Sequence, residues 1–186
     1  MTPASHALRL PAMLRRFTRN RDGISAVEFA IVLPFMLTLY LGGVEYGDGV
    51  SIQFKSTLAA RTVTDLASQY VSIDNSAMST ILGAASSVIA PYSATNVVVT
   101  VSEITTDANG NGTITWSDSL NGTAHTVGTA VTLPAILKTP SISLLWGEVT
   151  YPYTPAMGYV ITGTVNIYQN VYFYPRMSTS VSRVNS

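Results

Sequence analysis

The sequence of 186 residues contains no cysteine, and only 11% of its residues are charged. Without cysteine the chain has no thiol nucleophile, no disulfide and no cysteine-ligated zinc site. Its two histidines, His6 and His125, are far apart in sequence and predict no histidine-based triad or metal site. Glu103, Glu148 and the other acidic residues show no spacing that predicts an acid–base couple. We therefore expect a protein that is not an enzyme and that binds no cofactor.

The few charges are unevenly placed along the chain. Residues 1–23 hold five arginines and a single acidic residue, Asp22, and an apolar run follows directly. A basic segment before an apolar run is typical of the cytoplasmic flank of a membrane span. No nucleic-acid-binding module follows it, so we expect no nucleic-acid partner. We interpret residues 1–23 as a basic cytoplasmic leader.

Residues 24–47 predict a transmembrane helix. Between Glu28 and Glu45 lie 16 uncharged residues, most of them apolar. A bilayer core requires about 20 helical residues, which residues 24–47 supply if Glu28 and Glu45 lie near the two interfaces. A secretory signal peptide is one alternative, but its apolar region is usually about 7–15 residues long. A plain membrane anchor is another, but it leaves unexplained a carboxylate inside the apolar block, which is costly there.

Residues 48–90 predict an amphipathic helix followed by a connector. Apolar residues recur every three or four positions on what would be one helix face, which we expect to pack on a sheet. These residues are Phe54, Leu58, Ala59, Val63, Leu66 and Tyr70.

Residues 91–186 predict a β-rich domain outside the membrane. Apolar and hydroxyl side chains alternate over residues 97–102 and 113–117, and residues 160–174 are rich in Val, Ile, Thr and Tyr. Asn-Gly pairs at residues 109–110, 111–112 and 121–122 predict tight turns between strands. The expected fold class is α+β: a long membrane-spanning helix continues into an amphipathic helix, which packs on an antiparallel sheet of four or five strands.

One turn has the spacing of a calcium-binding loop. Asp107, Asn109, Asn111 and Asp118 stand at the first, third, fifth and twelfth positions of such a loop. The last ligand is Asp instead of the bidentate Glu, and the flanks read as strands. We favour a hairpin tip and keep a metal site only as a weak candidate.

Residues 19–47 resemble the start of a known family, the TadE/TadF-like pseudopilins. These are minor components of Tad (Flp-type, type IVb-related) pilus systems. The family pattern is Gly-x-x-Ala-Val-Glu-Phe-Ala, a following Leu-Pro, and a Glu and a Gly near the helix exit. This sequence matches it at Gly23, Ala26, Val27, Glu28, Phe29, Ala30, Leu33, Pro34, Glu45 and Gly47. The resemblance implies a pilin-like fold and a role in Tad pilus biogenesis.

The resemblance also implies how the chain is processed and assembled. A prepilin peptidase would cleave after Gly23 and leave Ile24 as the new N-terminus. Glu28 would then pair with the N-terminal amine of a neighbouring subunit, since a carboxylate in low dielectric is tolerated only when it is paired. The implied partners are other pilins or pseudopilins, the peptidase, the pilus assembly platform and the lipid bilayer. The implied location is the bacterial inner membrane, with one pass and the C-terminal domain extracytoplasmic.

Four more residues of this span are candidates for assembly. Pro34 predicts a helix kink that would help helices pack, although a tolerated proline explains it equally well. Gly43 and Gly47 form a G-x-x-x-G pair that would let another helix approach, or else a flexible exit. Glu45 would lie at the outer interface or form a second interhelical pair.

The alternative function is a single-pass, envelope-anchored binding module whose outer β-domain does not polymerise. Several points stay open at this stage: whether the leader is cleaved, whether the subunit initiates, caps or is dispersed in a pilus, and whether the β-domain contributes to adhesion.

Overall fold

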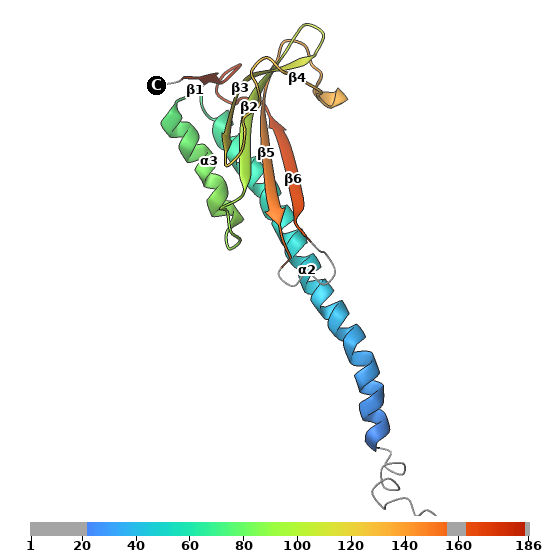
Figure 1. Ribbon diagram of the computed structural model, residues 1–186. Helices are drawn as coiled ribbons and strands as arrows, with labels where there is room; N and C mark the ends of the chain where they lie inside the picture. The colour runs from blue at the N-terminus through green and yellow to red at the C-terminus, as the bar shows by residue number, and fades with distance from the viewer. Residues whose placement is uncertain (1–21, 156–162, 185–186) are drawn as a thin grey trace, which may run out of the picture. The chain divides into compact units, whose positions relative to one another are not determined.

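The structure is a computed structural model that describes residues 22–155 and 163–184 (Figure 1). Most of the predicted leader lies outside the described residues. The elements in chain order are α2 (Asp22–Ser68), β1 (Ser72–Ile73), α3 (Asn75–Ile89), β2 (Val98–Thr106), β3 (Gly112–Leu120), β4 (Ala130–Val131), a short 3-10 helix (Ala135–Leu137), β5 (Ser143–Tyr153), β6 (Val165–Phe173) and β7 (Ser182–Arg183). The chain divides into two units, Met1–Val44 and Glu45–Ser186.

The second unit is built on a five-stranded sheet in the order β4-β3-β2-β5-β6, and each pairing in it is antiparallel. The central strand β2 pairs on both sides, so that Thr100 lies opposite Ser119 of β3 and Glu148 of β5. Together with the long apolar N-terminal helix, this sheet confirms the predicted α+β fold. The structure adds a separate parallel pair, in which β1 runs beside β7.

Helix α2 packs on the sheet through small side chains. Ala59, Ala60 and Thr64 are fully buried, and a Cβ added to Gly147 of β5 would overlap the Thr64 side chain. The buried positions of α2 recur at helical spacing and include Ile52, Ala59 and Val63. Phe54 and Leu58 lie off this stripe and are exposed, so their predicted place on the buried face is wrong.

A second helix, α3, occupies much of the segment that we expected to be a connector. Its N-cap is Asp74, whose side chain accepts a hydrogen bond from the Ala77 N–H at 2.7 Å. At the other end Lys55 of α2 donates to the carbonyl oxygens of Val88 and Ala90. A cation at a helix C-terminus satisfies free carbonyls and complements the helix dipole. The buried face of α3 joins that of α2 in one core over the same side of the sheet: Met78, Ile81, Leu82, Ala85 and Ile89.

The C-terminal segment closes the domain from the far end of the chain. The backbone of Val181 is held on both sides: Glu103 accepts from its N–H at 2.8 Å, and Trp116 Nε1 donates to its carbonyl oxygen at 2.6 Å. Glu103 is almost fully buried, and it also accepts from the Ser143 hydroxyl. Arg183 of β7 pairs with Asp118 at 2.8 Å. The burial of a carboxylate is thus compensated by donors from two distant segments.

Candidate functional site

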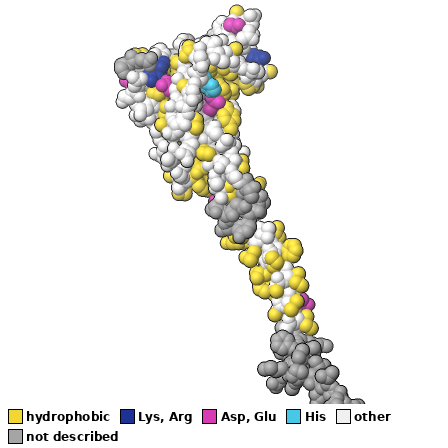
Figure 2. Space-filling view, viewed as in Figure 1, with side chains coloured by type: hydrophobic (Ala, Val, Ile, Leu, Met, Phe, Trp, Pro, Cys, Tyr) yellow, Lys and Arg dark blue, Asp and Glu magenta, His cyan; other side chains and the backbone are white. Residues whose placement is uncertain are grey.

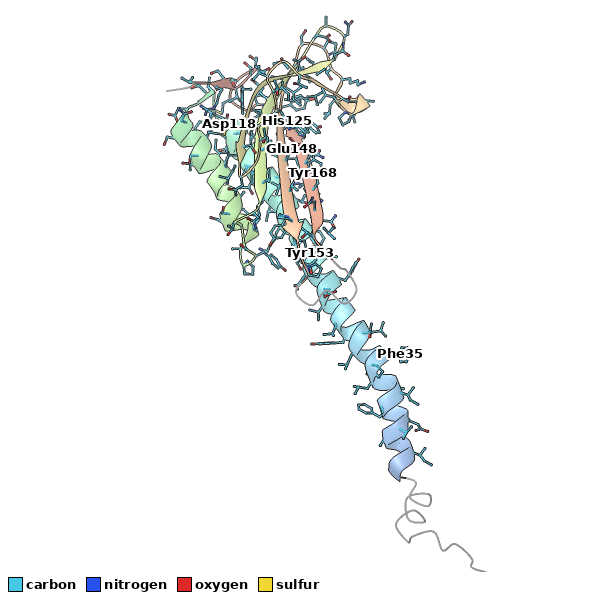
Figure 3. All side chains as sticks on the ribbon, viewed as in Figure 1. Phe35, Asp118, His125, Glu148, Tyr153 and Tyr168 are labelled. Carbon is cyan, nitrogen blue, oxygen red and sulfur yellow. The ribbon has the colours of Figure 1, made fainter. Side chains whose placement is uncertain are left out.

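The first half of α2 presents large apolar side chains to its surroundings. From Gly23 to Val44, Glu28 is the sole charged residue, and mean hydropathy reaches 2.0 over an 18-residue window of the helix. Figure 2 shows the hydrophobic side chains along this part of the helix, and Figure 3 labels one of them, Phe35, which is 69% exposed. Among the described residues this is the one helix that is long and apolar enough to cross a membrane, consistent with a single-pass membrane protein.

The predicted processing residues lie at the start of this helix. Helix α2 begins at Asp22, so Gly23 and Ile24 belong to its first turn. Both residues are exposed, and nothing lies within 4 Å of the position that a Cβ on Gly23 would take. Glu28 follows one turn later, is exposed, and forms no ion pair with any residue that the structure describes. A partner for this carboxylate would therefore have to come from outside the described chain.

Helix α2 continues through Pro34. The hydroxyl of Thr38 donates to the Pro34 carbonyl oxygen at 2.8 Å, so this carbonyl has a side-chain partner one turn further on. Gly43 and Gly47 each have open space where a Cβ would stand. The open positions at Gly43 and Gly47 leave room for another helix, and the assembly role of Pro34, Gly43 and Gly47 stays a prediction.

Glu45 differs from the expected interface residue because it is buried. Its exposed fraction is 3%, and neither carboxylate oxygen has a hydrogen-bond partner among the described residues. Its backbone carbonyl accepts a hydrogen bond from the Tyr153 hydroxyl at 3.0 Å, which ties α2 to the end of β5. A second interhelical pairing through Glu45 stays a prediction, and it would require this carboxylate to be uncovered.

The candidate calcium ligands are not gathered at one point. Asp107 folds onto its own turn: its carboxylate accepts from the backbone N–H groups of Asn109 and Asn111 and from the Asn111 side chain. These bonds, that with the Asn111 side chain foremost, lower the pKa of Asp107 below its ordinary value. Asp118 stands six residues beyond Gly112 on β3, about 20 Å away at the usual rise of a strand, and pairs with Arg183.

A polar cluster on the outer face of the sheet was not predicted from the sequence (Figure 3). Glu148 of β5 accepts from the Tyr168 hydroxyl at 2.6 Å and bonds to His125 Nε2. The His125 ring also stacks on Trp146, with the ring centroids 4.8 Å apart. Burial raises the pKa of Tyr168, and its hydrogen bond to Glu148 raises it further. The sequence did not predict the contact between His125 and Glu148, which forms because the loop after β3 folds back across the sheet.

A comparison with known families identifies one segment of the chain. Residues 23–65 match the family of TadE-like proteins. This TadE-like segment confirms the resemblance carried by residues 19–47 and indicates a Tad pilus-related protein. It covers most of α2 and ends before the sheet. No curated protein and no solved structure matches the chain.

Proposed function

We propose that the chain is a minor pilin or pseudopilin of a Tad pilus system. It is inserted with its N-terminus in the cytoplasm, cleaved by a prepilin peptidase after Gly23, and joined to a pilus or its base through α2. The observation that carries the proposal is that the TadE-like segment begins at Gly23, the residue after which cleavage is expected, at the very start of the apolar helix.

Cleavage after Gly23 would create a charged group at the start of the helix that can bind a carboxylate of another subunit. The new α-amine of Ile24 carries a positive charge, and Glu28 lies about one helical turn away from it along α2. Within one subunit the Ile24 amine and the Glu28 carboxylate lie on the same side of the helix. Between subunits, the amine of one chain can reach the carboxylate of the next only when the two helices are offset by certain distances along their axes. Since an unpaired charge in low dielectric is costly, this arrangement favours one register over its neighbours.

The two halves of α2 would contribute differently to assembly. Inside a bilayer, apolar side chains gain little from leaving lipid, so association there depends on close packing and polar pairing. Glu28 and the Gly43–Gly47 pair supply those features. Beyond the apolar half, Tyr46, Phe54 and Leu58 are exposed on the same helix. Covering a large apolar side chain that would otherwise meet water contributes about 1.5–3 kcal/mol.

The proposed role is structural, and its partners are other pilins or pseudopilins, the prepilin peptidase, the membrane assembly platform and the bilayer. The decisive experiment is the intact mass of the membrane-extracted protein. A mass that lacks residues 1–23 supports the proposal, whereas a full-length mass in cells with an active peptidase contradicts it.

Variants at the cleavage bond sharpen this test. Gly23→Phe should accumulate as the full-length precursor, because a peptidase that binds an extended chain needs a small residue before the cut. Gly23→Ala should be cleaved more readily than Gly23→Phe. Val27→Phe adds the same ring one turn beyond the bond and serves as the matched control, with cleavage retained.

A further inference from the structure

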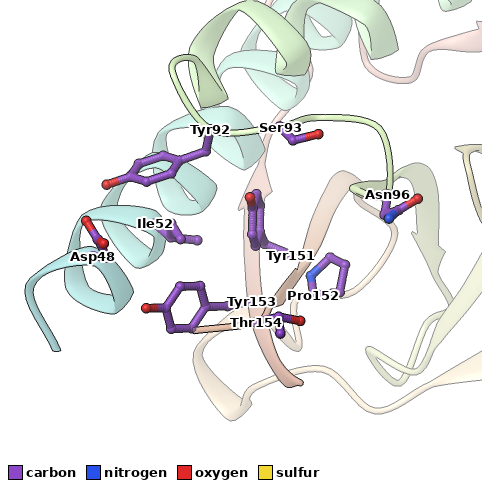
Figure 4. A pocket seen from close by; sticks show the side chains of 9 residues that line it. All are labelled: Asp48, Ile52, Tyr92, Ser93, Asn96, Tyr151, Pro152, Tyr153 and Thr154. Atoms are coloured by element: carbon purple, nitrogen blue, oxygen red, sulfur yellow. The ribbon is translucent and has the colours of Figure 1, made fainter. Parts of the chain in front are cut away.

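A pocket of about 330 Å³ opens within the Glu45–Ser186 unit (Figure 4). Its walls come from three segments: Asp48 on α2, Tyr92 on the loop after α3, and Tyr151 and Tyr153 near the end of β5. The two β5 tyrosines are two positions apart and therefore point to the same face of the sheet. The fold thus brings three phenol rings and one carboxylate around a single hollow.

The aromatic walls suit a cation. The face of a tyrosine ring carries negative electrostatic potential and attracts an ammonium or guanidinium group within about 6 Å of the ring centre. Tyr151 and Tyr153 are buried and Tyr92 is partly buried, so all three rings are held in place by packing. A rigid aromatic wall loses little conformational entropy when a ligand enters.

The charged residues near the pocket also favour a cation. Asp48 is exposed and forms no ion pair with the described residues, and no lysine or arginine lines the hollow. Glu45 lies one turn earlier on α2, buried and without a hydrogen-bond partner in the described chain. Burial raises the pKa of Tyr153, and the negative charges of Asp48 and Glu45 raise it further. Asp48 is therefore the one charged side chain among the described residues that line the pocket, and a cation would neutralise it.

The position of Asp48 along α2 indicates where such a cation would come from. In the sequence Asp48 comes directly after the predicted membrane span, residues 24–47. Tyr40 and Tyr46 are exposed in the same stretch, as is typical of helix segments at a membrane interface. If the apolar half spans a bilayer, Asp48 lies at the level of the lipid headgroups. The Asn96 side chain also lines the pocket and offers amide N–H donors, which suit a phosphate.

We propose that this pocket binds an ammonium group, and that the group is supplied by the headgroup of a zwitterionic phospholipid such as phosphatidylethanolamine. The tyrosine rings face the ammonium, Asp48 neutralises it, and Asn96 donates to the adjoining phosphate. The proposal goes beyond the pilus role and requires neither cleavage nor polymerisation.

The test uses the purified full-length chain in two arms. In the first, tetramethylammonium chloride is titrated against the detergent-solubilised protein, and binding is followed by saturation transfer to its methyl protons. In the second, the protein is reconstituted in nanodiscs with equal amounts of phosphatidylethanolamine and phosphatidylglycerol, and the retained lipids are counted by native mass spectrometry. The wild-type protein should bind tetramethylammonium and retain phosphatidylethanolamine preferentially.

Two variants should weaken both signals. Tyr92→Leu and Asp48→Asn should each reduce binding about 3- to 30-fold, the range expected for one cation–π or charge contact. Tyr46→Leu is the matched control. Tyr46 is an exposed tyrosine on the same turn of α2 as Asp48, but it does not line the pocket, so this variant should retain wild-type binding. Melting curves check that the variants fold. If Tyr92→Leu does not fold, binding by Asp48→Asn, a change at an exposed position, tests the proposal alone.

Three results would overturn the proposal. Absence of binding in both arms excludes the pocket as an ammonium site. Binding of tetramethylammonium without preference for phosphatidylethanolamine excludes the headgroup as its source. Equal losses in Tyr46→Leu and Tyr92→Leu assign the lipid preference to general interfacial anchoring. Repeating the assay with the Gly23→Phe precursor separates this proposal from the pilus role, because the uncleaved chain should bind equally well.

Discussion

Gly147 of β5 lies directly against Thr64 of α2, and no side chain larger than hydrogen fits between them. An added Cβ would overlap the Thr64 hydroxyl and would lie 3.1 Å from the Ala60 carbonyl oxygen. Thr64 cannot easily turn away, because its hydroxyl donates to that same carbonyl at 2.6 Å. The contact fixes the separation between helix and sheet.

We therefore expect Gly147→Ala to destabilise the domain by about 1–3 kcal/mol, the usual cost of overpacking. Gly83→Ala is the matched control: Gly83 lies inside α3 with open space around it, so alanine should stabilise the domain by about 0.5–1 kcal/mol. Thermal unfolding of the full chain in detergent measures both. A Gly147→Ala protein as stable as wild type would mean that helix and sheet can separate without cost.

Helix α3 was not predicted, although its sequence carries helix signals. Asp74 is a good N-cap residue, and the buried positions of α3 recur at helical spacing. The signal was weak because Ser, Thr, Ala and Gly fill the rest of the segment. The existence of α2 and the antiparallel sheet was predictable, since long periodic or alternating runs identify them.

Strand β5 was harder to predict, because Gly147 and Pro152 interrupt its alternating pattern. Pro152 is tolerated because the pairing with β2 ends at Thr150, so the proline removes no hydrogen bond on that side. The contact of His125 with Glu148 depends on a loop crossing the sheet and has no local sequence signal.

The second prediction concerns the acid titration of the hairpin tip. Since the pKa of Asp107 is lowered in the folded chain, its contribution to stability is present above the ordinary value of 3.8 and is lost as pH falls through the folded pKa. The Asn111 side-chain amide resonances should therefore shift with a midpoint below pH 3.8. A midpoint at or above that value would contradict the hydrogen-bonded turn. Asp107→Asn should abolish the shift.

The third prediction is that the same hairpin binds calcium weakly or not at all. Asp107 already accepts three hydrogen bonds from its own turn, and Asp118 is engaged by Arg183. Titration calorimetry of the full chain should give no dissociation constant below about 10⁻⁵ M, the range of sensor sites. Tighter binding that is lost in Asp107→Asn would show that the loop rearranges around the metal.

The fourth prediction concerns membrane orientation. Five arginines precede the apolar segment, and Lys55 is the single basic residue in the ten residues after position 47. The domain that follows α2 should therefore lie outside the cytoplasm. Protease added to intact spheroplasts should digest it, while a cytoplasmic marker protein stays intact. Protection of the domain until the membrane is permeabilised would reverse the proposed orientation.

The fifth prediction separates assembly from processing. Glu28→Ala should insert normally, since the change makes the span more apolar, but it should not enter pili. Loss of one partner of a desolvated ion pair costs about 3–5 kcal/mol. Immunoblots of membrane and sheared-pilus fractions measure both steps. Ser25→Ala, one turn earlier, is the control and should assemble. Wild-type piliation by Glu28→Ala would remove the assembly role from this carboxylate.

The hydrogen bonds of Glu103 and Trp116 to the Val181 backbone constrain the order in which the domain can fold. Strand β1 cannot pair with β7 before residues 182–183 have been synthesised. The hydrogen bonds of Glu103 and Trp116 to the Val181 backbone require the same segment. If the domain is translocated N-terminal end first, more than a hundred residues emerge before the chain can close on itself. Until then Glu103 is a carboxylate without its backbone donor, and the nascent domain stays open to proteases and chaperones on the far side of the membrane. The domain thus completes its fold only after residues 181–183 become available to pair.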